Sequence, residues 1–223
     1  MYWRDEGYLL SKNSFDENSL IIEAFTLNHG KYSGVVFGGS SRKLKNVLQI
    51  GNKLVLNLKS KSENRIGYFT VELDKPVSPM YFQDKRKSIS ILAASNILKI
   101  LLPERQLNKK IYHSFEKFIE MLNYNNWIEY YIFWELLLVK ELGYEINFNY
   151  QKKHFDNSIT SISINGRNFK IPKMLSEHNE VNRTNLQVKE ALYFNRNLLM
   201  EYFTLPNKIK FPSFRFILEK YFK

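Results

Sequence analysis

Hydrophobic and polar residues alternate in the first third of the chain, a pattern typical of β-strands with one buried face. Between residues 53 and 59, Leu54, Leu56 and Leu58 fall on one side of an extended backbone and polar residues on the other. Four further strand-like runs, separated by turn residues, occupy residues 8–10, 18–27, 31–37 and 66–73. Five short strands with one irregular connection predict a small closed barrel of the OB type.

The pattern changes to a helical period after Pro76. Apolar residues recur every three or four positions in five later segments, which are residues 86–102, 111–122, 127–142, 188–203 and 214–221. Pro103 and Gly143 mark the ends of the first and third segments, and Thr184 with Gln187 can form a capping box before the fourth.

A polar stretch interrupts the helical part. Residues 145–176 contain short β-like pieces on both sides of Asn165-Gly166, a dipeptide typical of two-residue hairpin turns. The sequence therefore predicts an α+β fold. Residues 1–80 form an N-terminal five-stranded OB-fold β-barrel, and residues 81–223 form a mainly α-helical C-terminal domain with a β-hairpin excursion.

The charge is strongly positive, with 33 Lys and Arg against 22 Asp and Glu and a net charge of +11. This excess favours a nucleic acid as partner ahead of an anionic membrane surface. The 24 Lys and 23 Asn also fit the codon bias of an AT-rich genome, which would distribute lysine evenly. Residues 42–65 instead gather seven basic residues and one acidic residue. We therefore predict phosphate contacts from Arg42, Lys43, Lys45, Lys59, Lys61 and Arg65. Ordinary solvated lysines are the alternative.

Three aromatic residues near this cluster, Tyr32, Phe37 and Tyr68, are candidates for stacking on bases. The favoured interpretation places them in the core, because a strand aromatic is more often buried than exposed. Glu135 lies in an apolar run of a predicted helix and is expected to be buried. A buried carboxylate needs a partner, and Arg105 is a candidate.

Catalytic motifs are missing from the sequence. The absence of cysteine excludes disulfides, thiol catalysis and cysteine-based zinc sites, and the four histidines form no metal-ligand pair. There is no P-loop and no serine-nucleophile motif. The acidic pairs Asp5-Glu6 and Asp16-Glu17 do not converge easily, because adjacent strand residues point to opposite faces. We predict solvated or turn carboxylates, and a protein that is not an enzyme and has no cofactor or metal.

Two further observations bear on the cellular location of the protein. Acidic residues stand where a signal peptide would be basic, and no apolar run is long enough to cross a bilayer. We expect a cytoplasmic protein without a membrane partner.

Several short strings appear in a characteristic order. They are WRDEG at 3–7, TLNHG at 26–30, GGSSR at 38–42, VLQIGN at 47–52, LPER at 102–105 and WELLLVKELG at 134–143. In this order and spacing the chain resembles the bacterial recombination mediator RecO, in its alphaproteobacterial form. Residues 145–180 match the family poorly. Many RecO proteins carry a four-cysteine zinc motif in the segment corresponding to residues 144–173, and we predict no zinc here.

The resemblance implies a DNA repair and recombination mediator. Such a protein binds single- and double-stranded DNA, anneals complementary strands and, together with RecR, helps load RecA recombinase onto DNA coated with single-strand-binding protein. It also implies contact with the acidic C-terminal tail of that coat protein. In the family the loop after the third strand helps bind DNA, which supports Arg42, Lys43 and Lys45. Whether RecF takes part stays open.

An acidic, apolar tail requires a basic residue beside an apolar pocket. Lys208, Lys210 and Arg215, near Phe211 and Phe214, are candidates, although a solvated face of the last helix is the favoured interpretation. Two other functions are weighed against the mediator. An OB-fold RNA-binding or translation-associated adaptor fits the charge and the barrel equally well, and a Mg²⁺-dependent nuclease ranks below both.

Overall fold

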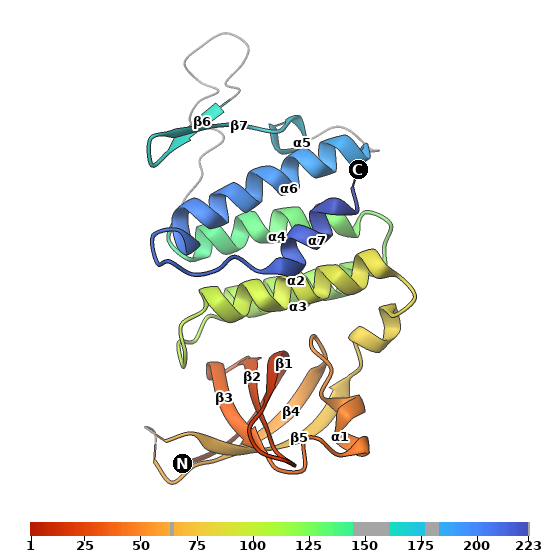
Figure 1. Cartoon of the computed structure of the whole chain (residues 1–223), viewed down its shortest axis with the longest axis vertical. Helices are drawn as coiled ribbons and strands as arrows, with labels where there is room; N and C mark the ends of the chain where they lie inside the picture. The colour runs from red at the N-terminus through yellow and green to blue at the C-terminus, as the bar shows by residue number, and fades with distance from the viewer. Residues whose placement is uncertain (63–64, 145–160, 177–182, 223) are drawn as a thin grey trace. The chain divides into compact units, whose positions relative to one another are not determined.

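The computed structural model describes residues 1–62, 65–144, 161–176 and 183–222 (Figure 1). The chain divides into two compact units, Met1–His113 and Ser114–Lys223. The compact units divide after His113, whereas the sequence predicts the domain boundary at residue 80. The first compact unit extends beyond it, because helix α2 (Lys85–Leu101) packs against the first strand.

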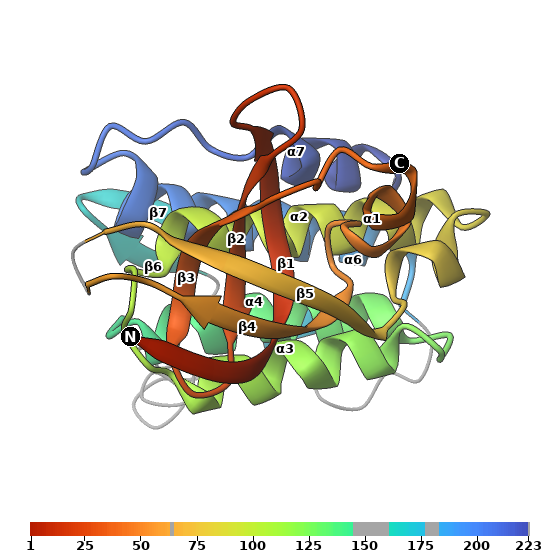
Figure 2. The same ribbon diagram turned by 90° about the horizontal axis from the view of Figure 1, so that it is seen from below.

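Five strands of the first unit form a closed barrel in the order β1-β2-β3-β5-β4. They are β1 (Tyr2–Ser14), β2 (Leu20–Thr26), β3 (Gly30–Val36), β4 (Lys53–Lys59) and β5 (Gly67–Lys75). All neighbours are antiparallel except β3 and β5, which are parallel. Figure 2 shows β4 and β5 crossing the front of the barrel. This topology confirms the predicted five-stranded barrel of the OB type.

Side-chain alternation fills the barrel interior. Leu54, Leu56 and Leu58 are wholly buried, as the sequence pattern predicts. The barrel closes where Gly34 of β3 lies beside β5, and a Cβ atom on Gly34 would stand only 2.4 Å from Cδ2 of Phe69. Glycine is therefore required at this position, because any side chain would push the two strands apart.

The second unit is helical, as expected. Its helices are α4 (Trp127–Glu141), α5 (Lys173–Ser176), α6 (Asn185–Leu199), the π-helical turn η3 (Met200–Thr204) and α7 (Ser213–Lys220), and α3 (Lys109–Met121) begins in the first unit. Thr184 and Gln187 form the predicted capping box of α6. Among the described residues, none of the helices is both long and apolar enough to span a membrane.

The predicted hairpin is present in the second unit. Strands β6 (Ser161–Ile164) and β7 (Arg167–Lys170) pair antiparallel around Asn165 and Gly166, whose φ angles are +51° and +77°. Two consecutive positive φ angles are the requirement of a type I′ turn, which explains the Asn-Gly sequence. The remainder of the predicted excursion, residues 145–160, lies outside the described residues.

Glu135 of α4 is completely buried, as predicted, but its partner is Arg215 of α7. The Arg215 Nε and Nη2 atoms donate to the two Glu135 carboxylate oxygens at 2.5 and 3.0 Å, and Nη2 also donates to the Leu192 carbonyl at 2.6 Å. Burial alone would lower the pKa of Arg215, but the attraction of Glu135 outweighs it and raises that pKa. The expectation of Arg105 was wrong, because Arg105 lies in the first unit with its guanidinium 5.0 Å from the Tyr32 ring.

Candidate nucleic-acid interface

Three of the predicted phosphate-binding residues lie on a short helix that the sequence pattern did not reveal. Helix α1 (Arg42–Val47) begins after Ser41, whose side chain accepts a hydrogen bond from the Leu44 backbone N–H at 3.4 Å. Leu44 and Val47 pack against the barrel core. The basic residues of the helix project to solvent, and we call them the α1 group: Arg42, Lys43 and Lys45. Six residues are too few for a helical period to stand out.

The other three predicted residues form the hairpin group, which consists of Lys59 at the end of β4 and Lys61 and Arg65 in the connection to β5. All three are exposed. Figures 1 and 2 place α1 and the β4–β5 connection on opposite sides of the barrel. The single basic cluster of the linear sequence is therefore two separate groups in space.

The two groups differ from other basic residues of the barrel unit in their ion pairing. Within the described part of the chain, no residue of either group forms an ion pair with a carboxylate. Other lysines of this unit are paired, such as Lys53 with Glu6 at 3.0 Å and Lys99 with Glu23 at 3.2 Å. Exposed cations that form no ion pair can exchange their counterions for the phosphates of a nucleic acid.

A lysine of the first strand contacts the backbone at the end of α1. Lys12 of β1 donates through Nζ to the carbonyl of Leu48, just after α1, at 2.5 Å. Burial first, and then repulsion from Lys45, lower the pKa of Lys12. The repulsion reflects two like charges, Lys12 and Lys45, at this end of the barrel.

Outward-facing aromatic side chains surround Lys59. Tyr2 of β1 and Tyr68 of β5 stand directly opposite Lys59 in the two flanking ladders. Tyr2 is 71% exposed and Tyr68 is 45% exposed. Phe37, which follows β3, is 59% exposed and stacks on Tyr68 with ring centroids 4.8 Å apart. We call Tyr2, Lys59, Tyr68 and Phe37 the aromatic row.

The prediction that these three aromatic residues lie in the core is correct for Tyr32, which is 6% exposed, and wrong for Phe37 and Tyr68. Tyr2 was not among the residues predicted from the sequence. The alternation of side chains at the start of β1 could have indicated it, because Tyr2 and the buried Trp3 point to opposite faces of the strand. Alternation identifies two faces of a strand, and only the fold shows which face has no cover.

The β4–β5 connection is held by Ser60. Its hydroxyl donates to the carbonyls of Ser62 and Arg65, at 2.7 and 3.2 Å. Its backbone N–H donates to the Met1 carbonyl at 2.9 Å, which continues the ladder between β1 and β4. These bonds fix the backbone on both sides of Lys61. They hold the connection that carries Lys61 and Arg65 next to Lys59, which belongs to both the hairpin group and the aromatic row.

The face that OB folds commonly use for ligands, formed by β2 and β3, is covered here. Lys99 of α2 pairs with Glu23 of β2, and the Lys31 ammonium of β3 donates to the Lys99 carbonyl at 2.7 Å. The Ser33 hydroxyl of β3 donates to Glu104 at 2.6 Å. The usual binding surface is therefore occupied by the protein itself, which leaves α1 and the β1–β4–β5 surface available.

Asp5 and Asp16, from the two acidic pairs of the sequence, both accept hydrogen bonds from the backbone. Asp5 is buried, contrary to the expectation of a solvated residue, and accepts from the Asn28 backbone and side-chain nitrogens at 2.8 and 3.0 Å. It also pairs with His29 Nδ1 at 2.7 Å. Asp16 is the expected turn carboxylate and accepts from the Asn18 N–H at 2.9 Å. Across the described ranges, no group of three or more His, Asp or Glu residues is placed to hold a metal ion.

One of the candidates for partner binding must be corrected. Arg215 is completely buried against Glu135 and cannot reach a partner at the surface, because the apolar side of α7 faces α4 and α6. Lys208 and Lys210 are exposed. Phe211 is only 7% exposed.

Comparison with known proteins identifies the family. Residues 1–76 match the family model described as Recombination protein O N terminal, and residues 83–153 match Recombination protein O C terminal. The chain belongs to the RecO family. The DNA repair protein RecO of Roseobacter denitrificans is 35% identical over 147 residues, which cover 66% of this chain and 61% of that protein.

A second RecO relative, the DNA repair protein RecO of Wolbachia sp. subsp. Drosophila simulans, is 34% identical over 151 residues, covering 67% of this chain and 62% of the relative. The protein of the same name from Cereibacter sphaeroides is 35% identical over 147 residues, or 66% and 61% of the two chains. The matched segment thus spans about three fifths of these relatives.

The strings that carry the RecO resemblance have structural roles in this barrel. Asn52, at the end of VLQIGN, accepts through Oδ1 from the backbone N–H groups of Val77 and Ser78 at 2.9 and 3.2 Å, and donates to the Val47 carbonyl at 3.0 Å. At Gly30 of TLNHG, φ is +71° and a Cβ atom would stand 2.2 Å from the Gln106 carbonyl oxygen. Asn52 and Gly30 thus stabilise the barrel, whereas Arg42, the last residue of GGSSR, belongs to the α1 group.

Proposed function

We propose that this protein is a DNA repair and recombination mediator that binds single- and double-stranded DNA through the α1 group and the hairpin group of its barrel. The observation that carries the proposal is a RecO-family barrel with exposed cations on two opposite sides. Its relatives are named DNA repair proteins, which supports a role in that process.

The mechanism we propose is strand annealing without catalytic turnover. Two DNA strands repel each other through their phosphates, and each cation that contacts a phosphate reduces this repulsion and releases a counterion. Two separate cation groups allow one barrel to hold two strands at once. The family resemblance supports the remaining steps, in which the protein acts in the cytoplasm with RecR and the acidic tail of single-strand-binding protein to load RecA.

The salt dependence of binding tests the electrostatic part. If about five phosphates are contacted, log K against log[salt] has a slope near −3.5 for single strands. Replacing the α1 group by glutamine (R42Q/K43Q/K45Q) is expected to make this slope about 2 units shallower. The matched control K75Q/K85Q/K109Q removes three other exposed charges of the same unit and is expected to leave the slope nearly unchanged. Equal effects of both variants would mean that net charge alone drives binding.

An annealing assay tests the function itself. Two complementary oligonucleotides, each coated with single-strand-binding protein, are mixed with and without this protein, and duplex formation is followed. A coat protein without its acidic tail is the control. Faster annealing that depends on the tail supports the mediator. DNA binding without faster annealing, together with equal affinity for RNA, would favour the RNA-binding adaptor instead.

A further inference from the structure

The aromatic row is a patch of large rings that the fold leaves exposed. Tyr2, Tyr68 and Phe37 are 71%, 45% and 59% exposed. The residues beside them in sequence, such as Trp3 and Phe69, are buried in the barrel. Neighbouring exposed aromatic side chains on a soluble protein mark a binding surface more often than chance solvent exposure does.

The chemistry of this row fits a nucleic acid whose bases are unpaired. Lys59 stands between Tyr2 and Tyr68 on the same side of the sheet, so a cation alternates with two aromatic rings across three strands. Lys61 and Arg65 of the hairpin group follow at the same end of β4. Rings receive the faces of bases, and the interspersed cations contact the phosphates between them.

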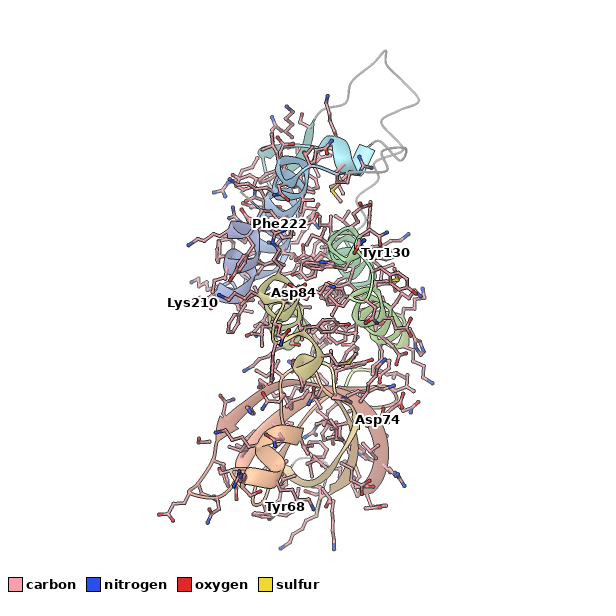
Figure 3. The ribbon with its side chains drawn as sticks, turned by 90° about the vertical axis from the view of Figure 1, so that its right-hand side faces the viewer. Tyr68, Asp74, Asp84, Tyr130, Lys210 and Phe222 are labelled. Atoms are coloured by element: carbon pink, nitrogen blue, oxygen red, sulfur yellow. The ribbon has the colours of Figure 1, made fainter. Side chains whose placement is uncertain are left out.

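The charge on the outer surface of β1, β4 and β5 changes along the strands, away from the aromatic row. The next outward row across β1, β4 and β5 is Arg4, Asn57 and Thr70, and the row after it is Glu6, Val55 and Glu72. The outer surface of the three strands thus changes from an aromatic and basic row, through a row with one further cation, Arg4, to a row with two carboxylates, Glu6 and Glu72. Figure 3 shows Tyr68 and the acidic Asp74 near opposite ends of β5. The Tyr68 end is therefore more favourable for phosphates than the row of Glu6 and Glu72, although Lys53 offsets part of the Glu6 charge.

We propose that the aromatic row is a base-stacking site specific for single-stranded DNA, whereas the α1 group binds phosphates of single and double strands alike. A duplex cannot use the row, because its bases are already stacked on one another. The α1 group lies on the opposite side of the barrel and has no exposed aromatic residue within α1 itself. This inference rests on the proposed function, since it assigns the strand preference of the same barrel.

The test removes the stacked rings without removing charge. In F37A/Y68A both rings of the stacked pair are lost, while F37Y/Y68F keeps them. The control F15A/F82A removes two other rings of the same unit that are 55% and 64% exposed. Binding is measured by fluorescence anisotropy with an oligomer of about 20 thymidines, longer than one OB fold covers, and with a duplex of the same length.

We expect F37A/Y68A to bind the thymidine oligomer about 10-fold more weakly or worse, with less than about a 2-fold change for the duplex. Its salt slope stays that of the unmodified protein, because no charge is lost. F37Y/Y68F and F15A/F82A are expected to bind like the unmodified protein. The charge variant K59Q/K61Q/R65Q should instead make the slope about 2 units shallower.

Two results would overturn the inference: equal weakening for single strand and duplex, or unchanged single-strand affinity of F37A/Y68A. Thermal melting of each variant shows whether it is folded, and Tyr68→Ala alone provides a milder replacement if the double variant is not. If the unmodified protein binds neither DNA form, the proposed function itself fails. If it binds both with a steep salt slope and the rings have no effect, only the stacking site is refuted.

Discussion

The buried pair of Glu135 and Arg215 allows a quantitative test of what holds the helical unit together. Both side chains are completely buried, and they come from α4 and α7. Asn195 of α6 donates to the Glu135 carboxylate at 3.2 Å, and the Leu192 carbonyl accepts from Arg215. Three helices are therefore joined through one ion pair, and the loss of either charge leaves the other buried without its main partner.

The expected magnitude follows from that burial. Arg215→Met leaves the Glu135 carboxylate buried without a cation, with the Asn195 amide still donating to it, and should cost about 3–5 kcal/mol of unfolding free energy. Glu135→Leu leaves the guanidinium with the Leu192 carbonyl and with Glu219, whose oxygen is 3.6 Å away, and should cost a similar amount. In the double variant no charge is stranded. Its loss should stay within about 2 kcal/mol, mainly from the unpaired Leu192 carbonyl.

The assay is urea unfolding of the two single variants and the double variant, followed by tryptophan fluorescence. Two of the three tryptophans, Trp127 and Trp134, belong to the second unit and report on it directly. The sum of the unfolding free energies lost in the two single variants should exceed the loss in the double variant by about 4 kcal/mol or more. Additive losses, or a loss below about 1 kcal/mol in Arg215→Met, would refute the reasoning. DNA binding of the folded variants should be unchanged, because the proposed site lies in the first unit.

Three further substitutions have expected outcomes. Gly34→Ala should lower the unfolding free energy of the barrel by about 1–3 kcal/mol in urea titrations, because the added Cβ overlaps the Phe69 ring, and unchanged stability would contradict the close approach. Asp5→Asn should cost about 1–3 kcal/mol, because its amide would face the backbone N–H of Asn28, and the thermal melting point would show it. Thr184→Ala should cost about 1 kcal/mol and speed hydrogen exchange in the first turn of α6, and equal exchange would argue against the capping box.

Much of the secondary structure follows from the sequence alone, because it depends on neighbours in the chain. The alternation of Leu54, Leu56 and Leu58 identified β4 with its correct bounds. Asn165 with Gly166 identified the type I′ turn, since few residues tolerate two positive φ angles in succession. The six exposed cations could likewise be selected from local charge density.

The arrangement of the candidate site was decided by the tertiary structure. Residues 42–65 are one basic cluster in the sequence, yet barrel closure sends α1 and the β4–β5 connection to opposite sides. The partner of Glu135 is 80 residues away, beyond any local pattern. Tyr68 is exposed while Phe25, also on the outer side of the barrel, is covered by Tyr112. A strand's period defines two faces, and only packing between residues distant in sequence determines which face meets solvent.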